Sequence, residues 1–314
     1  MNNYKFKNFV NQVNSLGTLQ FRVLKESVEK RVKSKKVANI LETPIKEIKC
    51  PHCKSSHFIR WGKRNDLQRY KCKSCTKTFN SLTNTPLARL NKKDKWLNYS
   101  KCLKEGLTVR KAAIKCNVHR NTAFRWRHRF INNLKFIKSK CLAGIIETNE
   151  LKLKESFKGA KVINTKLRKD VHIIQCIDRN RNVYDITNKG FDLNTLNNFL
   201  TKVYHKDSLL CINRKEIYIE FSKLNNFKYS CSSLIPKKDS IIKTQNIDNY
   251  INNLYKWIMN HFRGVATKYL ENYVSWFRSL YEFRNGISPL TLLYRSKQVE
   301  KYRHQPQKVT SWVL

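Results

Sequence analysis

Acidic residues are scarce in this chain, and their scarcity limits what the protein is suited to bind. Among 314 residues there are 22 Asp and Glu against 64 Lys and Arg, which gives a formal net charge of +42. A compact protein with this charge repels itself unless a polyanion neutralises it, so nucleic acid is a better partner than an acidic small substrate or a membrane surface. An A+T-rich genome would raise the lysine content, but it would raise Glu and Asp equally, and these are few.

Long apolar runs are also missing. No run comes near the roughly 18 consecutive apolar residues that a transmembrane helix needs, and the first residues lack the apolar segment of a signal peptide. We therefore expect no membrane contact and a cytoplasmic, nucleoid-associated protein. The length predicts two or three domains, and a hydrophobic content of 40% is enough to form a core.

Four of the ten cysteines form two Cys-x2-Cys pairs with 18 residues between them. In a reducing compartment this arrangement favours metal binding over disulfides, and the spacing lies within the range of tetrahedral zinc sites. Four thiolates complete a closed site, so we predict a structural Zn²⁺ ion without a chemical role. The predicted ligands are Cys50, Cys53, Cys72 and Cys75, with His52 and His57 as alternative ligands.

Residues 92–131 have the pattern of a helix-turn-helix. Apolar residues at helical spacing predict two helices, then a turn and a third helix over 120–130. We expect Ala123, Phe124 and Trp126 of the third helix to face inward. The alternative is a helical bundle with a solvated basic face. The side chains left for the DNA groove and the phosphates are Arg120, Asn121, Arg125, Arg127, His128 and Arg129.

The remaining segments mix helical and strand patterns. Residues 1–46 predict two short helices followed by a basic run. Further along the chain, the patterns predict strands over 171–177, 182–186 and 209–212 and helices over 193–203 and 247–283.

Four blocks, residues 69–90, 107–128, 154–159 and 262–277, together resemble insertion-sequence transposases. That family combines an N-terminal zinc ribbon, a helix-turn-helix and an RNase H-like catalytic domain of the DDE type. The resemblance implies a multidomain α+β protein whose RNase H-like α/β domain has a mixed sheet. The implied domains are N-terminal helices (1–46), the zinc ribbon (47–82), the helix-turn-helix DNA-binding region (83–140), the RNase H-like domain (141–285) and a C-terminal tail (286–314).

The resemblance also implies binding of double-stranded DNA at element ends, with strand cleavage and transfer by two Mg²⁺ ions on carboxylates. Because two ends are held together, it implies a homodimer or higher oligomer. The family's carboxylate positions correspond to Asn149, Asn213 and Asp248, and its lysine is retained as Lys268, a candidate DNA contact. Both expected aspartates are therefore asparagines.

An amide cannot neutralise a metal's charge, bridge two ions or act as a base. We therefore expect severely weakened Mg²⁺ binding and little or no strand transfer. Neighbouring acids are candidate substitutes: on a strand, Glu147 shares the face of Asn149, whereas Glu150 points to the opposite face. Asp178 is a third candidate, although a turn position is the commoner explanation for such an acid.

Two other functions fit parts of the sequence. A non-catalytic repressor derived from a transposase would bind element ends without chemistry. A zinc-ribbon transcription or RNA-binding factor would account for the first 140 residues, but it leaves residues 154–159 and 264–270 unexplained.

Overall fold

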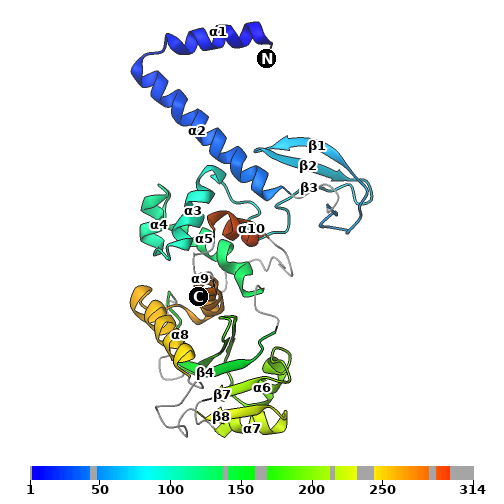
Figure 1. The fold of residues 1–314 in the computed structure, drawn as a ribbon. Helices are drawn as coiled ribbons and strands as arrows, with labels where there is room; N and C mark the ends of the chain where they lie inside the picture. The colour runs from blue at the N-terminus through cyan, green and yellow to red at the C-terminus, as the bar shows by residue number, and fades with distance from the viewer. Residues whose placement is uncertain are drawn as a thin grey trace, which may run out of the picture.

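The computed structural model describes residues 2–42, 48–136, 141–159, 168–212, 216–231, 244–282 and 288–297. The predicted site residue Asn213 lies outside these ranges, as does most of the predicted C-terminal tail. Figure 1 shows an elongated molecule with two helices at one end, a small sheet beside them, a helical layer in the middle and a second sheet at the other end. No described helix combines the length and apolar character that crossing a lipid bilayer requires.

The N-terminal helices α1 (Asn3–Asn14) and α2 (Thr18–Leu41) extend away from the rest of the protein (Figure 1). Two short helices are predicted here, and α2 is longer than predicted, at 24 residues. None of the α1 residues is buried, and α2 buries only Val37, Ala38 and Leu41 at its C-terminal end. These three residues join the core of the helical layer.

A small antiparallel sheet follows, in the order β1-β2-β3, with β1 at Phe58–Arg64, β2 at Leu67–Cys72 and β3 at Thr78–Asn80. A two-residue turn joins β1 to β2, and its residues Asn65 and Asp66 both have positive φ. Asn and Asp tolerate this conformation, which a tight hairpin requires. The sheet is tied to α2, because Asp66 accepts a hydrogen bond from the Ser34 hydroxyl at 2.8 Å.

The helical layer is built around three helices that enclose a buried aromatic core. Trp96 and Tyr99 are fully buried there, and the Trp276 indole N–H donates to the Leu103 carbonyl at 3.1 Å. The layer therefore includes C-terminal helices in addition to the predicted helix-turn-helix. Its elements are η2 (Lys93–Lys95), α3 (Trp96–Lys104), α4 (Val109–Lys115), α5 (Arg120–Ile131), η3 (Asn132–Phe136), part of α9 (Thr267–Glu282) and α10 (Pro289–Lys297).

The second sheet has five strands in the order β6-β5-β4-β7-β8. Strands β4, β5 and β6 are antiparallel neighbours, whereas β4 pairs with β7, and β7 with β8, in parallel. This is the mixed sheet of an RNase H-like domain, and the three predicted strands are confirmed. The strands are β4 (Ile145–Lys154), β5 (Asp170–Asp178), β6 (Val183–Asn188), β7 (Leu209–Ile212) and β8 (Lys228–Cys231).

Helices cover both faces of this sheet. Helices α6 (Leu193–Leu200) and α7 (Glu216–Leu224) pack on one face, and α8 (Gln245–Lys256) and α9 pack on the other. Alternation along β4 therefore sends Ile146 and Thr148 toward α6 and α7, and Glu147, Asn149 and Leu151 toward α8.

The prediction of one continuous helix over 247–283 is wrong. Helix α8 ends at Lys256, a π-helical turn, η5 (Trp257–His261), follows, and α9 starts at Thr267. Between them Arg263 and Gly264 have φ values of 52° and 82°, a left-handed conformation that cannot continue an α-helix. The break lets two separate helices pack on the same sheet face.

One buried ion pair ties α9 to the sheet. The fully buried Arg278 guanidinium pairs with Asp185 of β6 and also donates to the Leu134 carbonyl at 2.9 Å. We expect Arg278→Met to lower the free energy of unfolding by about 3–5 kcal/mol, because it leaves a buried carboxylate without its counter-charge. Urea denaturation measures this loss.

Lys135→Met is the matched control. It removes the more exposed pair of Lys135 with Glu271, joined at 3.5 Å, and should cost less than about 1 kcal/mol. Equal losses in the two variants would show that Arg278 contributes no more than a surface charge.

Candidate nucleic-acid interface and carboxylate site

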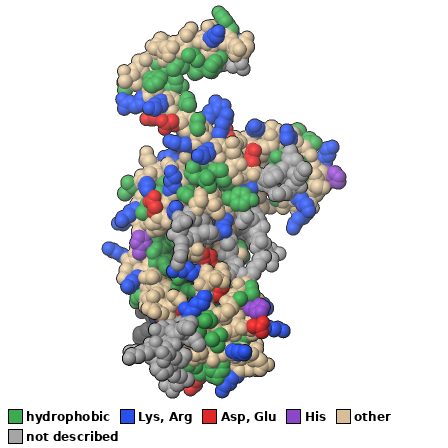
Figure 2. Space-filling view, in the orientation of Figure 1, with side chains coloured by type: hydrophobic (Ala, Val, Ile, Leu, Met, Phe, Trp, Pro, Cys, Tyr) green, Lys and Arg blue, Asp and Glu red, His purple; other side chains and the backbone are tan. Residues whose placement is uncertain are grey.

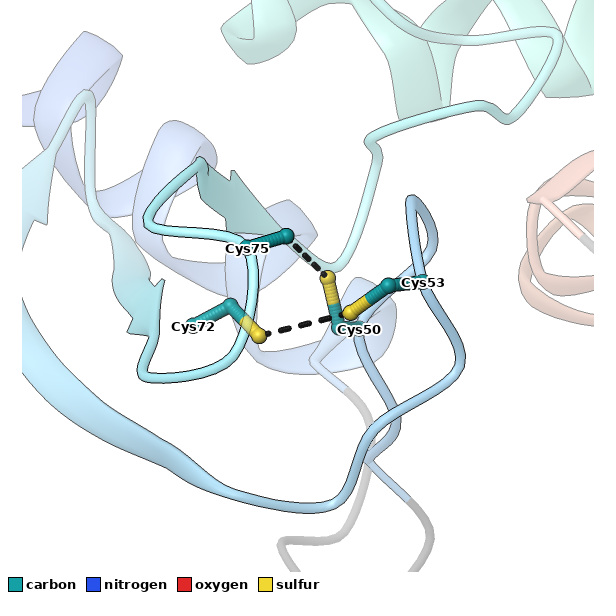
Figure 3. A group of neighbouring side chains, drawn as sticks. All are labelled: Cys50, Cys53, Cys72 and Cys75. Carbon is teal, nitrogen blue, oxygen red and sulfur yellow. Dashed lines mark hydrogen bonds between the residues drawn. The ribbon is translucent and has the colours of Figure 1, made fainter.

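The four predicted zinc ligands converge on one point (Figure 3). Cys50 and Cys53 lie in the loop before β1, Cys72 ends β2, and Cys75 lies in the turn before β3. Their sulfur atoms all lie within 4.8 Å of one another, with Cys50 to Cys75 at 3.6 Å and Cys53 to Cys72 at 3.5 Å. Tetrahedral zinc with Zn–S bonds near 2.3 Å requires sulfur atoms about 3.8 Å apart, so the cluster fits a zinc ion.

The local chemistry favours thiolate at one of the four cysteines. Backbone hydrogen bonds from Cys75 and Ser74, together with hydrogen bonds from neighbouring thiols, lower the pKa of Cys72 to about 6, whereas burial and hydrogen bonds to the other cysteines raise the pKa of its neighbour Cys53. A thiolate is the form that binds metal. The alternative ligands His52 and His57 do not belong to this group of converging side chains, which among the described residues consists of the four cysteines.

The third helix of the helix-turn-helix, α5, presents part of the predicted DNA-contacting set. Arg120, Asn121 and Arg125 are exposed on it, and Lys268 is exposed at the start of α9. The His119 side chain caps α5 by accepting a hydrogen bond from Asn121 N at 3.2 Å. Arg129 is only half-exposed and donates to the Pro86 carbonyl at 3.3 Å.

Two side chains of α5 are placed differently from the prediction. Arg127 is fully buried: it donates to the Leu107 carbonyl, and its guanidinium lies 5.1 Å from the Trp276 ring centre. A buried guanidinium does not reach DNA, so Arg127 is removed from the predicted surface. Phe124, predicted to face inward, is instead 42% exposed.

The structure brings Asn149 and Asp248 together. The Asn149 amide Nδ2 donates to Asp248 Oδ1 at 2.9 Å, across the gap between β4 and α8. The other end of the same amide, Oδ1, accepts from Glu150 N at 2.8 Å. Asp248 also accepts from the Thr244 hydroxyl at 3.0 Å. Each half of the amide therefore has a specific partner.

Glu147 lies on the same face but is already engaged. Its carboxylate is buried and accepts from Arg179 at 2.9 Å, Asn246 Nδ2 at 2.8 Å and Ile247 N at 2.9 Å. The last two bonds hold the first turn of α8, where the helix dipole favours a negative charge. Arg179 and Asn246 were missed in the sequence because their approach to Glu147 depends on tertiary packing.

The other candidate acids are elsewhere. Glu150 faces the opposite side of the sheet, where its carboxylate lies 3.4 Å from His172 Nδ1. Asp178 closes the β5–β6 turn by accepting from Asn182 N at 2.9 Å and Asn182 Nδ2 at 2.8 Å. Among the described residues, two carboxylates therefore lie near Asn149. Asp248 is hydrogen-bonded to the Asn149 amide, and Glu147 is paired with the Arg179 guanidinium. This arrangement does not fit two divalent ions.

Two of the blocks noted in the sequence meet although about 100 residues separate them. Ser156 and Thr267 exchange hydrogen bonds at 2.8 Å in both directions. Lys158 Nζ donates to three successive carbonyls, Phe262 O, Arg263 O and Gly264 O, at 2.9–3.2 Å. These contacts give the blocks a shared structural role in closing the loop between α8 and α9.

Comparisons with known proteins agree with the sequence blocks. Residues 97–135, which contain α4, α5 and nearly all of α3, match the Homeodomain-like domain family. A curated relative, an uncharacterized protein in transposable element ISH50 of Halobacterium salinarum, is 29% identical over 112 residues. The relative is a protein of a transposable element, which agrees with the resemblance to insertion-sequence transposases. The match covers 35% of this chain and 38% of the relative's length.

A solved structure of a pre-cleavage Mos1 transpososome also aligns, with 12% identity and a TM-score of 0.20 over 65% of this chain and 79% of that one. A score this low carries no argument about fold. The strand order β6-β5-β4-β7-β8, with β4 and β7 parallel, is what identifies the RNase H-like sheet.

We expect Cys72→Ser to abolish zinc binding and to unfold the β1–β3 ribbon, because a structural zinc ion contributes folding free energy directly. The helical core should remain, since the ribbon residues around the cysteines form a cluster of their own. Metal analysis of the purified protein and limited proteolysis test this. Cys141→Ser, at an exposed cysteine outside the cluster, is the control, and equal metal content in both variants would contradict the assignment.

Proposed function

We propose that this chain is a transposase-like protein that binds the DNA ends of an insertion element and is impaired in strand cleavage and transfer. The observation that carries the proposal is the hydrogen bond from the Asn149 amide to Asp248 on an RNase H-like sheet, in a chain with a helix-turn-helix. The chain thus combines a DNA-binding module with a carboxylate site in which asparagine stands at one of the family's acidic positions.

The charge distribution supports DNA binding. Basic side chains extend over the face in Figure 2, from α2 to the mixed sheet, and acidic side chains on it are few. Arg120, Asn121 and Arg125 on α5 are the proposed contacts to bases and phosphates, with Arg129 and Lys268 contacting phosphate. Zinc would stabilise the ribbon, and a homodimer or higher oligomer would hold two ends together.

The impairment follows from hydrogen-bond chemistry. With aspartate at position 149, two carboxylates would face each other near 3 Å, an arrangement that repels unless a cation bridges it. The amide instead donates a proton to Asp248, so the pair is stable without metal. Glu147 does not replace the lost acid, because Arg179 and the first turn of α8 occupy its oxygens.

The second candidate function, a non-catalytic repressor of active element copies, is favoured by the same amide. Both functions require DNA binding and predict no strand transfer by the natural chain. They differ in the effect of that binding, because only a repressor would lower transposition by an active copy of the element.

We expect affinity for duplex DNA to fall steeply with salt, by roughly a thousandfold or more between 50 and 200 mM if six to ten phosphates are neutralised. Fluorescence anisotropy with duplexes from the DNA flanking the gene measures this. A flat salt response would refute the basic surface as the DNA contact. Arg125→Ala should weaken binding. Lys33→Ala is the charge-matched control, because Lys33 is paired with Glu29 at 3.2 Å and is not among the proposed DNA contacts.

We expect no strand cleavage or joining by the natural chain with Mg²⁺ or Mn²⁺, and recovery of activity in the Asn149→Asp/Asn213→Asp double variant. A gel assay on the same duplexes measures both. In the double variant, adding Asp248→Asn should abolish activity, because it removes a facing carboxylate. Adding Glu150→Gln should not, because Glu150 points to the other side of the sheet.

Activity of the unmodified chain would contradict the impairment. A second readout is independent of turnover: Mn²⁺ should raise the Tm of Asn149→Asp but leave that of the natural chain unchanged, because only the variant gains a site for the cation.

A further inference from the structure

A half-open groove of about 940 Å³ separates the helix-turn-helix from the loop between α8 and α9. Helices α4 and α5 form one wall, and residues 260–266 with Lys158 form the other. Its size is that of a ligand pocket, roughly 300–1,000 Å³, so it has room for nucleotides of one strand and not for a duplex.

The lining of the groove is basic. Arg110, Lys111 and Arg120 lie on the helix-turn-helix side, and Lys158 and Arg263 lie on the opposite side. Among the described residues that line it there is no Asp or Glu. A concave surface with charge of one sign concentrates the opposite charge, here the phosphates of a nucleic acid.

Aromatic rings lie beside these charges. His128 stacks on Tyr269 with ring centres 3.8 Å apart, and Phe124 packs edge-on against His128 at 4.5 Å. Burial, with the positive charges of Arg127 and Lys268, lowers the pKa of His128 to about 3, so the ring is uncharged at neutral pH. Phe124 is 42% exposed and lines the groove. It presents an apolar ring to an incoming base.

We propose that this groove binds an unpaired DNA strand, with its phosphates against the basic rims and a base stacked on Phe124. The proposal deepens the DNA-binding function proposed above and rests on it. A base inside a duplex is already stacked on its neighbours, so only an unpaired base is free to stack on Phe124. Arg120 and Asn121, the proposed duplex contacts, also line the groove, so an unpaired strand that leaves a duplex on α5 would enter the groove beside them.

Lys158 is a positioning residue in this arrangement. Its ammonium group bonds the carbonyls of Phe262, Arg263 and Gly264, and it thereby holds Arg263 at the rim. Arg263 itself has a left-handed backbone with a φ of 52°, a conformation that costs energy for a residue other than glycine, so the loop depends on such support.

The test compares a single-stranded oligothymidylate, the same strand made abasic, and a blunt duplex, by anisotropy with full-length protein. We expect Phe124→Ala to weaken oligothymidylate binding by about fivefold to a hundredfold, the usual effect of removing one stacking ring. It should leave blunt-duplex binding unchanged. The neighbouring residue Arg125 does not line the groove, so Arg125→Ala should have the opposite selectivity.

Phe124→Leu and Phe124→Tyr separate ring stacking from folding. Leucine keeps apolar volume without a ring and should behave like alanine, whereas tyrosine should retain binding. Ile114→Ala, at an 82% exposed apolar residue of α4 outside the groove lining, is the surface control.

Equal binding of the abasic and thymidylate strands by the natural chain would overturn the proposal, as would equal losses for duplex and single strand in Phe124→Ala. Phe124-dependent binding of the single strand without any duplex binding would support the groove while refuting duplex binding by the helix-turn-helix. The two proposals therefore fail in distinguishable ways.

Discussion

The packing of α9 is the constraint on which the rest of the structure depends. One helix supplies Tyr273 and Trp276 to the core of the helical layer and Leu270 and Val274 to the core over the mixed sheet. Arg278, one turn further along, pairs with Asp185 of β6. Because these contacts lie on successive turns of a single rigid helix, the position of the helix-turn-helix relative to the sheet is set by α9.

That placement explains why α5 is only partly available to DNA. Tyr269, in the first turn of α9, stacks on His128, and Trp276 lies against the buried Arg127. The N-terminal half of α5 keeps Arg120, Asn121 and Arg125 exposed. Residues from both halves of α5 line the groove together with Tyr269 and Tyr273, so the packing of α9 on α5 shapes the groove.

The carboxylate site shows how one atom changes the chemistry of a position. An aspartate and an asparagine have nearly the same shape, but the asparagine at 149 donates a hydrogen bond where aspartate would accept one. The amide forms a closed, metal-independent pair with Asp248, and the surrounding fold is retained. An asparagine at this position is therefore compatible with the mixed sheet and the helices packed on it.

The sequence by itself determined the local features: the four cysteines that converge, the helix-turn-helix and three strands of the mixed sheet. Each of these features depends on residue spacing or on the period of apolar residues within a short segment of the chain. Only the tertiary structure decided that the predicted helix over 247–283 breaks at Arg263 and Gly264, that Arg127 is buried, and that Arg179 neutralises Glu147. These outcomes depend on contacts between residues far apart in the chain. A local sequence pattern does not indicate which distant side chain will bury a charged group or form an ion pair with it.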